Sequence, residues 1–196
     1  MVKQEFEKTK KILSIFMIIY CFLILATISM ALCYGKTEIE VTIPVPTLAP
    51  IPINETRNYQ DSQWLTTYIA DSLVVGNDMK YLGTALINTN FTSANNDFTS
   101  ASTYANTLYK DSQKAMNNSN LYNVSSDLQS TKDEYQLEML QAQSAAVYIY
   151  YGIEAYNKGN IEAGESEMKQ AIQNITSVTE HANRAANLLK AYKSKH

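Results

Sequence analysis

Cysteine and proline are scarce in this chain of 196 residues, and the few that occur lie in its first third. The two cysteines are Cys21 and Cys33, so the chain beyond them can form neither an intramolecular disulfide nor a thiolate metal site. All four prolines lie between residues 44 and 52, and none follows. The remaining segment therefore lacks the residue that most strongly interrupts helices.

An excess of positive charge is also lacking. From Lys36 to His196 the sequence has 12 Lys and Arg against 17 Asp and Glu, and the whole chain has a formal charge of −3. Binding to nucleic acid requires clustered Lys and Arg that displace counterions from the phosphates. The acidic balance therefore argues against a nucleic-acid partner.

Residues typical of catalytic or metal sites are few. The only histidines are His181 and His196, and the sequence has no Glu-x-x-His pair, Cys-x-x-Cys-His motif, glycine-rich phosphate loop or Ser/His/Asp set. His181 is next to a predicted core position, and we interpret it as a flank or surface residue. We expect no catalytic residue, no cofactor and no metal ion, and therefore a protein that is not an enzyme.

One long apolar run is present near the N-terminus. Residues 12–34 contain no charged side chain, and a helix over them would span about 34 Å, enough to cross a hydrocarbon core of about 30 Å. Residues 1–11 carry Lys3, Lys8, Lys10 and Lys11 against two glutamates. By the positive-inside rule, residues 1–11 are cytoplasmic, 12–34 form a signal-anchor helix in the lipid bilayer, and the rest lies outside.

An alternative reading is a cleaved signal peptide. Ser29 and Ala31 are small residues with the spacing of a cleavage site, and cleavage near Ala31 would release a secreted protein. The apolar run is longer than an ordinary signal-peptide core and continues beyond this site, which favours the uncleaved, single-pass anchor. In both cases the following domain is extracytoplasmic.

Residues 35–55 are predicted to form an extended linker. Proline alternates there with apolar residues without a helical period, which favours a polyproline-like backbone. The linker would separate the membrane helix from the domain that follows.

Residues 56–196 are predicted to fold as an all-α domain: an antiparallel, up-down-up-down, left-handed four-helix bundle. Apolar residues recur there at alternating steps of three and four, the spacing of a coiled-coil seam. The predicted helices cover about residues 57–87, 91–116, 126–158 and 161–192. A capping box at Ser126–Gln129 would open the third helix, Gly159 would close it, and Asn160 would cap the fourth.

The predicted seams differ in regularity. The fourth has no polar member and consists of Ile161, Gly164, Met168, Ala171, Ile175, Val178, Ala182, Ala185, Leu189 and Tyr192. The third consists of Leu128, Lys132, Tyr135, Met139, Ala142, Ala146, Ile149, Ile153 and Tyr156. The second consists of Phe91, Ala94, Phe98, Ala101, Ala105, Leu108, Ser112 and Ala115. The first is the least regular and consists of Leu65, Ile69, Ser72, Gly76, Met79, Gly83 and Leu86.

Two groups of residues are candidates for sites on this domain. Tyr148, Tyr150 and Tyr151 form the densest aromatic cluster, and exposed tyrosines supply rigid contact area for a protein partner. The alternative for the cluster is core and flank packing. Sequons for N-glycosylation occur at Asn54, Asn90, Asn117, Asn123 and Asn174.

We therefore expect a membrane-anchored, extracytoplasmic helical bundle that acts as a non-enzymatic interaction or spacer module of the cell envelope, with an unknown protein partner there. The alternative is a small-ligand-binding, sensory-type bundle that acts through a partner membrane protein. The architecture is similar to the sensor domain of bacterial chemoreceptors, and the similarity is one of architecture only.

Overall fold

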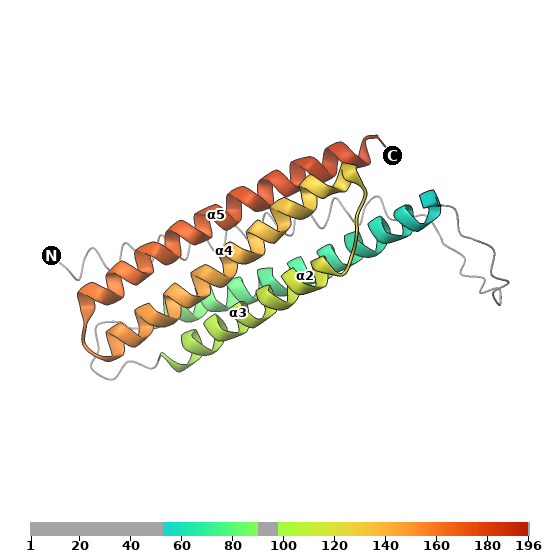
Figure 1. Ribbon diagram of the computed structural model, residues 1–196. Coiled ribbons are helices and arrows are strands. Elements are labelled where there is room, and N and C mark those ends of the chain that lie inside the picture. Colours follow the sequence, from blue (N-terminus) through green and yellow to red (C-terminus); the bar gives the residue numbers. More distant parts are fainter. Residues whose placement is uncertain (1–52, 90–97, 196) are drawn as a thin grey trace, which may run out of the picture.

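The computed structural model describes residues 53–89 and 98–195, with side chains from Tyr59 onward in the first stretch. These residues form four helices: α2 (Ile53–Asn88), α3 (Thr99–Asn120), α4 (Ser126–Asn157) and α5 (Ile161–Lys193) (Figure 1). No strand occurs in either described stretch. The predicted all-α class and the four-helix bundle are thereby confirmed, whereas segments 1–11, 12–34 and 35–52 lie outside the described residues.

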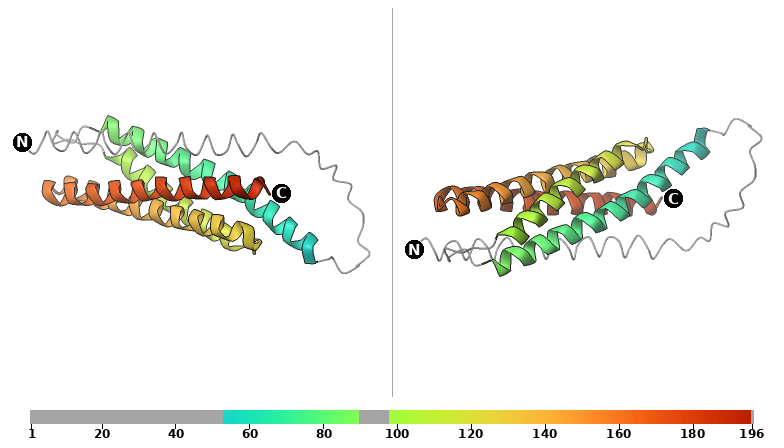
Figure 2. Two further views of the ribbon diagram at one scale, coloured as in Figure 1. Left: turned by 90° about the horizontal axis from the view of Figure 1, so that it is seen from above. Right: turned by 90° about the horizontal axis from the view of Figure 1, so that it is seen from below.

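Consecutive helices run in opposite directions, and α4 has a central place (Figure 1). The most extensive pairing joins α4 to α5, while α3 packs on α4 and α2 packs on α3. Both views in Figure 2 show α2 inclined to the long α4–α5 hairpin. The bundle is therefore a tight hairpin, α4–α5, covered on one side by a second pair, α2–α3.

The three C-terminal seams lie in the core as predicted. Every predicted position of α5 from Gly164 to Leu189 is buried, Tyr192 is half-buried and Ile161, in the first turn, is exposed. In α4 all predicted positions from Leu128 to Ile153 are buried. In α3 the seam is buried from Phe98 onward, while predicted members 91 and 94 lie outside the described residues.

The seam of α2 differs from the prediction in its first half. Leu65 and Ile69 are only partly buried, and the core positions are Trp64 and Tyr68. The two aromatic rings stack with centroids 5.4 Å apart, and the ring of Tyr68 meets Tyr135 of α4 edge-on at 4.9 Å. The larger rings occupy the core because they fill the wide gap between the inclined α2 and α4.

Helix ends and caps differ from the predicted ones at several places, and α3 starts at Thr99, with Phe98 as its N-cap, rather than at 91. α2 begins at Ile53, directly after Pro52 and within the segment predicted as linker. α3 continues to Asn120, past the predicted end at 116, because buried Ser119 occupies the next seam position. The predicted capping box at Ser126 is wrong: Ser125 is the N-cap residue of α4, and its side chain makes no capping hydrogen bond.

The turn between α4 and α5 forms as the sequence predicts. Gly159 has φ of 76°, a left-handed conformation that glycine adopts without steric cost. The side chain of Asn160 accepts a hydrogen bond from Ala163 N at 3.2 Å and so caps α5.

No helix within residues 53–89 and 98–195 combines the length and apolar character that a membrane span requires. The predicted anchor at 12–34 is not among these residues.

Candidate functional site

The predicted tyrosine cluster divides between core and surface. Tyr148 is half-buried and packs against the core, while Tyr150 and Tyr151 are 42% and 53% exposed. Their rings meet edge-on with centroids 6.0 Å apart. The hydroxyl of Tyr150 donates to Glu154 at 3.3 Å, and this carboxylate also pairs with Lys158 at 3.1 Å.

A shallow hollow of about 200 Å³ lies beside the two exposed tyrosines, between α3 and α4. Two of the residues that line it, Ala105 of α3 and Ala146 of α4, have small side chains. Its lining consists of Ala105, Asn106, Tyr109, Ala146, Val147, Tyr150 and Tyr151. Pockets for small ligands ordinarily enclose roughly 300–1,000 Å³, so this hollow is better suited to accept a side chain from a protein surface than to enclose a ligand.

The exposed tyrosines belong to a longer feature, a second seam on the solvent side of α4. Its positions follow steps of four and three, as the core seam does, but they face outward. We call this set the outer seam of α4. It consists of Asp133, Leu137, Leu140, Ser144, Val147, Tyr151, Glu154 and Lys158.

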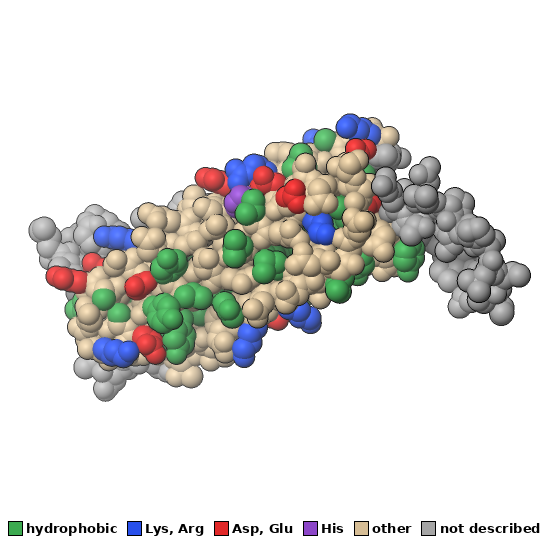
Figure 3. All heavy atoms as spheres, in the orientation of Figure 1, with side chains coloured by type: hydrophobic (Ala, Val, Ile, Leu, Met, Phe, Trp, Pro, Cys, Tyr) green, Lys and Arg blue, Asp and Glu red, His purple; other side chains and the backbone are tan. Residues whose placement is uncertain are grey.

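The middle of the outer seam is uncharged and mostly apolar: Leu137, Leu140 and Tyr151 are exposed, and Ser144 and Val147 are half-buried. Leu137 is 41% and Leu140 45% exposed, and Figure 3 shows hydrophobic side chains following α4 across this face. Between Glu134 and Glu154 the only charged residue of α4 is Glu138, which is buried. A contiguous apolar patch of this kind, bounded by charges, is typical of a protein–protein contact surface.

The outer seam is bounded by Asp133 at one end and by the ion pair of Glu154 and Lys158 at the other. Asp133 lies at the N-terminal end, where its side chain accepts a hydrogen bond from Gln129 at 2.7 Å. Lys158 lies at the C-terminal end with a side chain that is 73% exposed. The N-terminal end is thus anionic, and the C-terminal end carries an ion pair whose outermost member is Lys158.

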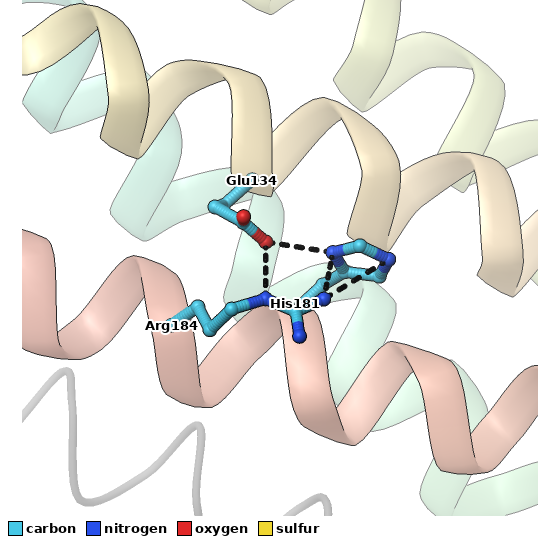
Figure 4. Close-up of polar contacts among 3 residues, drawn as sticks. All are labelled: Glu134, His181 and Arg184. Atoms are coloured by element: carbon cyan, nitrogen blue, oxygen red, sulfur yellow. Dashed lines mark hydrogen bonds and ion pairs between the residues drawn. The ribbon is translucent and has the colours of Figure 1, made fainter.

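His181 belongs to a polar cluster that joins α4 to α5 (Figure 4). Glu134 Oε2 lies 2.7 Å from His181 Nδ1 and accepts a hydrogen bond from Arg184 Nε at 2.9 Å. Burial acts to raise the pKa of Glu134, but hydrogen bonds from Arg184 and His181 outweigh it and lower that pKa. The cluster is a clamp between two helices.

The described residues contain no group of three or more His, Cys, Asp or Glu placed to hold a metal ion. In the Glu134 clamp, the cation beside the carboxylate is the guanidinium of Arg184. The side chain of His181 is half-buried at the boundary between α4 and α5.

Several polar side chains are buried where α2 meets its neighbours. The indole of Trp64 donates to Ser119 Oγ at 2.9 Å, and Asp61 accepts from Ser125 N at 2.7 Å. Asp78 of α2 faces Asp111 of α3, and burial followed by repulsion from Asp111 raises the pKa of Asp78 to about 7. These groups fix the position of α2, and sequence reasoning did not single them out.

The sequons lie in different environments. Asn123 is exposed in the α3–α4 loop, and Asn117 is exposed in the last turns of α3 rather than in the predicted loop. Asn174 is half-buried in the middle of α5, where its side-chain amide donates to Gln170 O at 2.8 Å. The side chains of Asn54 and Asn90 are not among those that the structure describes. Asn123 is the best placed of those described to receive a glycan.

Comparison of this chain with protein-family models, with curated proteins and with solved structures finds no match. The fold and the outer seam of α4 are therefore the basis for assigning a function.

Proposed function

We propose that this protein is a membrane-anchored, extracytoplasmic interaction module of the cell envelope. In this proposal, residues 12–34 cross the membrane with the N-terminus in the cytoplasm, and the segment up to Pro52 is a spacer. The bundle, left-handed because its core seams repeat every 3.5 residues, presents α4 to a protein partner. The protein is proposed to act by binding and not by catalysis.

The observation that supports this proposal is the outer seam of α4. An uncharged, apolar stretch of surface that continues over several helical turns costs solubility, and soluble surfaces rarely retain one without a binding role. Tyr150 and Tyr151 supply rigid aromatic area at one end of it, next to the α3–α4 hollow. The hollow is small for a ligand, so a protein surface is the better occupant.

In-cell photo-crosslinking tests this proposal. A benzophenone amino acid is placed at Val147, in the outer seam, and in a matched variant at Asn187, an exposed position of α5 outside the seam. We expect a protein adduct from position 147 of the full-length chain and none from position 187. The double substitution Tyr150→Ser, Tyr151→Ser should weaken the adduct. Equal adducts at both positions, or none at 147, would contradict the proposal.

A further inference from the structure

The spacing of the outer seam indicates what kind of partner it binds. Alternating steps of four and three let the side chains of one helix insert between those of another, and this packing requires the same spacing on both helices. The partner is therefore a helix with an exposed seam. α4 of a second copy of this chain has such a seam, and its length is necessarily the same.

The charges at the ends of the seam determine the relative direction of two copies. In a parallel pair, Asp133, Glu154 and Lys158 would each face the same residue of the other copy, and all three contacts would join like charges. In an antiparallel pair, Asp133 of each copy faces Lys158 of the other. Charges at the rim of an interface contribute little affinity but select orientation and register. The antiparallel arrangement is thus the one that the charges favour.

This register corresponds to a two-fold axis near residues 145 and 146, with the apolar pair Leu140 and Tyr151 on each side of it. The small side chain of Ser144 lies next to the axis, where the two helices approach most closely. Leu137 faces Glu154, whose carboxylate keeps its in-chain partners Tyr150 and Lys158 at the rim. The remaining opposed positions are Asp133 with Lys158, Leu140 with Tyr151, and Ser144 with Val147.

We propose that a second copy of this chain docks on the outer seam of α4, antiparallel and across a two-fold axis. This inference rests on the proposed function, because it names the partner of the same surface. Each copy contributes an identical patch, as in most symmetric dimers. α4 has 32 residues and is about 48 Å long, and a linker over 35–52 in the predicted extended conformation would span about 56 Å. Two antiparallel bundles can therefore be tethered to one membrane.

Cysteine crosslinking in membranes tests the proposal with the full chain. The natural cysteines are replaced by Cys21→Ser and Cys33→Ser, after which Ser144→Cys, Asp133→Cys and Lys158→Cys are made singly, and the last two also together. A short bis-maleimide should give a product of twice the 22.0 kDa chain for Ser144→Cys and for the double variant. It should give none for the two single end variants, because each end lies about 38 Å from its own copy in the antiparallel pair.

A pair of leucine variants identifies the surface. Leu140→Glu puts a charge in the apolar middle and should lower the Ser144→Cys crosslinked fraction at least tenfold. Leu188→Glu is the control, because Leu188 on α5 is similarly exposed, at 37%, and lies outside the seam. It should leave the crosslinked fraction unchanged. A circular dichroism spectrum identical to that of the parent must accompany both variants.

The outcomes separate this inference from the proposed function. Crosslinks from the single end variants would indicate a parallel pair and overturn the antiparallel dimer. A benzophenone adduct at Val147 with a different protein only, without a Ser144→Cys dimer, would overturn self-association but leave the interaction function. No benzophenone adduct at Val147 and no Ser144→Cys dimer would overturn both.

Discussion

Buried and half-buried polar side chains hold α2 against the rest of the bundle. Asn118 of α3 donates to both carboxylate oxygens of Asp71, at 3.0 and 3.3 Å, and the Trp64 indole donates to Ser119. Inside a bundle such hydrogen bonds fix one register, because a shifted helix would leave the same groups buried without partners. Removing the donor or the acceptor of one of these hydrogen bonds should therefore lower the free energy of unfolding.

Ser119 and Ser112 of α3 form a matched pair for this argument, since both are fully buried. Ser119→Ala leaves the buried Trp64 N–H without its acceptor and should lower the free energy of unfolding by about 1–3 kcal/mol. Ser112 Oγ has no hydrogen-bond partner among the described residues, so Ser112→Ala should be neutral or slightly stabilising. Chemical denaturation of both variants measures the difference. Equal losses would show that the indole bond is not what matters at Ser119.

Asp78 makes the stability of the bundle dependent on pH. The pKa of this carboxyl group is about 7 in the folded protein and about 4 in an unfolded chain, so the folded state keeps a proton that the unfolded state releases. The contribution of Asp78 to the free energy of unfolding is therefore retained at low pH and falls between about pH 4 and pH 7. Above pH 7 the repulsion between Asp78 and Asp111 acts in full.

Asp78→Asn removes this dependence and should raise Tm at pH 8 more than at pH 5. Each kcal/mol regained corresponds to roughly 2–4 °C for a domain of this size. Asp133→Asn is the control, because Asp133 is exposed on α4, where its carboxylate accepts a hydrogen bond from Gln129. A gain in Tm that is the same at both pH values would rule out a raised pKa for Asp78.

At the scale of helices, sequence periodicity predicts most of the core. The seams of α3, α4 and α5 follow from spacing alone, because small and aliphatic residues there face neighbours on well-aligned helices. In α2, the pair Leu65 and Ile69 and the pair Trp64 and Tyr68 have the same spacing of four residues, so either pair could face the core. The choice between them depends on Ser119 and Tyr135, which are distant in sequence, so local pattern cannot make it.

The candidate site was predicted only in part. Tyr150 and Tyr151 could be singled out as a cluster, but the outer seam to which Tyr151 belongs was missed. Its signal is present in the sequence, as a second set of apolar residues at steps of three and four in α4 beside the core seam. α4 is apolar on several faces because α3 and α5 both pack on it, and only the structure shows which face is left exposed.

The seam of α5 gives the sharpest test of the assigned core. Ile175 and Val178 are fully buried in its middle, so Ile175→Asp or Val178→Asp buries a charge without a partner. Either should lower the free energy of unfolding by roughly 4 kcal/mol or more and unfold the bundle. Gln173→Asp, which adds the same charge at an exposed position, should melt like the parent. Helical circular dichroism signals that are unchanged in both core variants would refute the assigned face.

At the scale of the whole molecule, the described residues form a closed hairpin, α4–α5, with the α2–α3 pair on one side and an exposed face on α4. The Glu134 clamp adds polar contacts between α4 and α5 next to that face. A dimer formed through the outer seam would place the α4–α5 hairpin, the most extensively packed pair of helices, at the interface. The interface would then need no rearrangement of the bundle.

The bundle is proposed to lie outside the cytoplasm and to be held at the membrane by residues 12–34. With both natural cysteines replaced by serine, Asn187→Cys places one thiol on the surface of α5, and Thr9→Cys places one in the segment proposed to be cytoplasmic. In intact cells, a membrane-impermeant maleimide should label the membrane-bound Asn187→Cys protein, and should label Thr9→Cys only after permeabilisation. Labelling of Asn187→Cys only after permeabilisation would show that the bundle lies in the cytoplasm. Recovery from the medium of a shortened protein without residues 1–31 would show that the N-terminal helix is cleaved and is not an anchor.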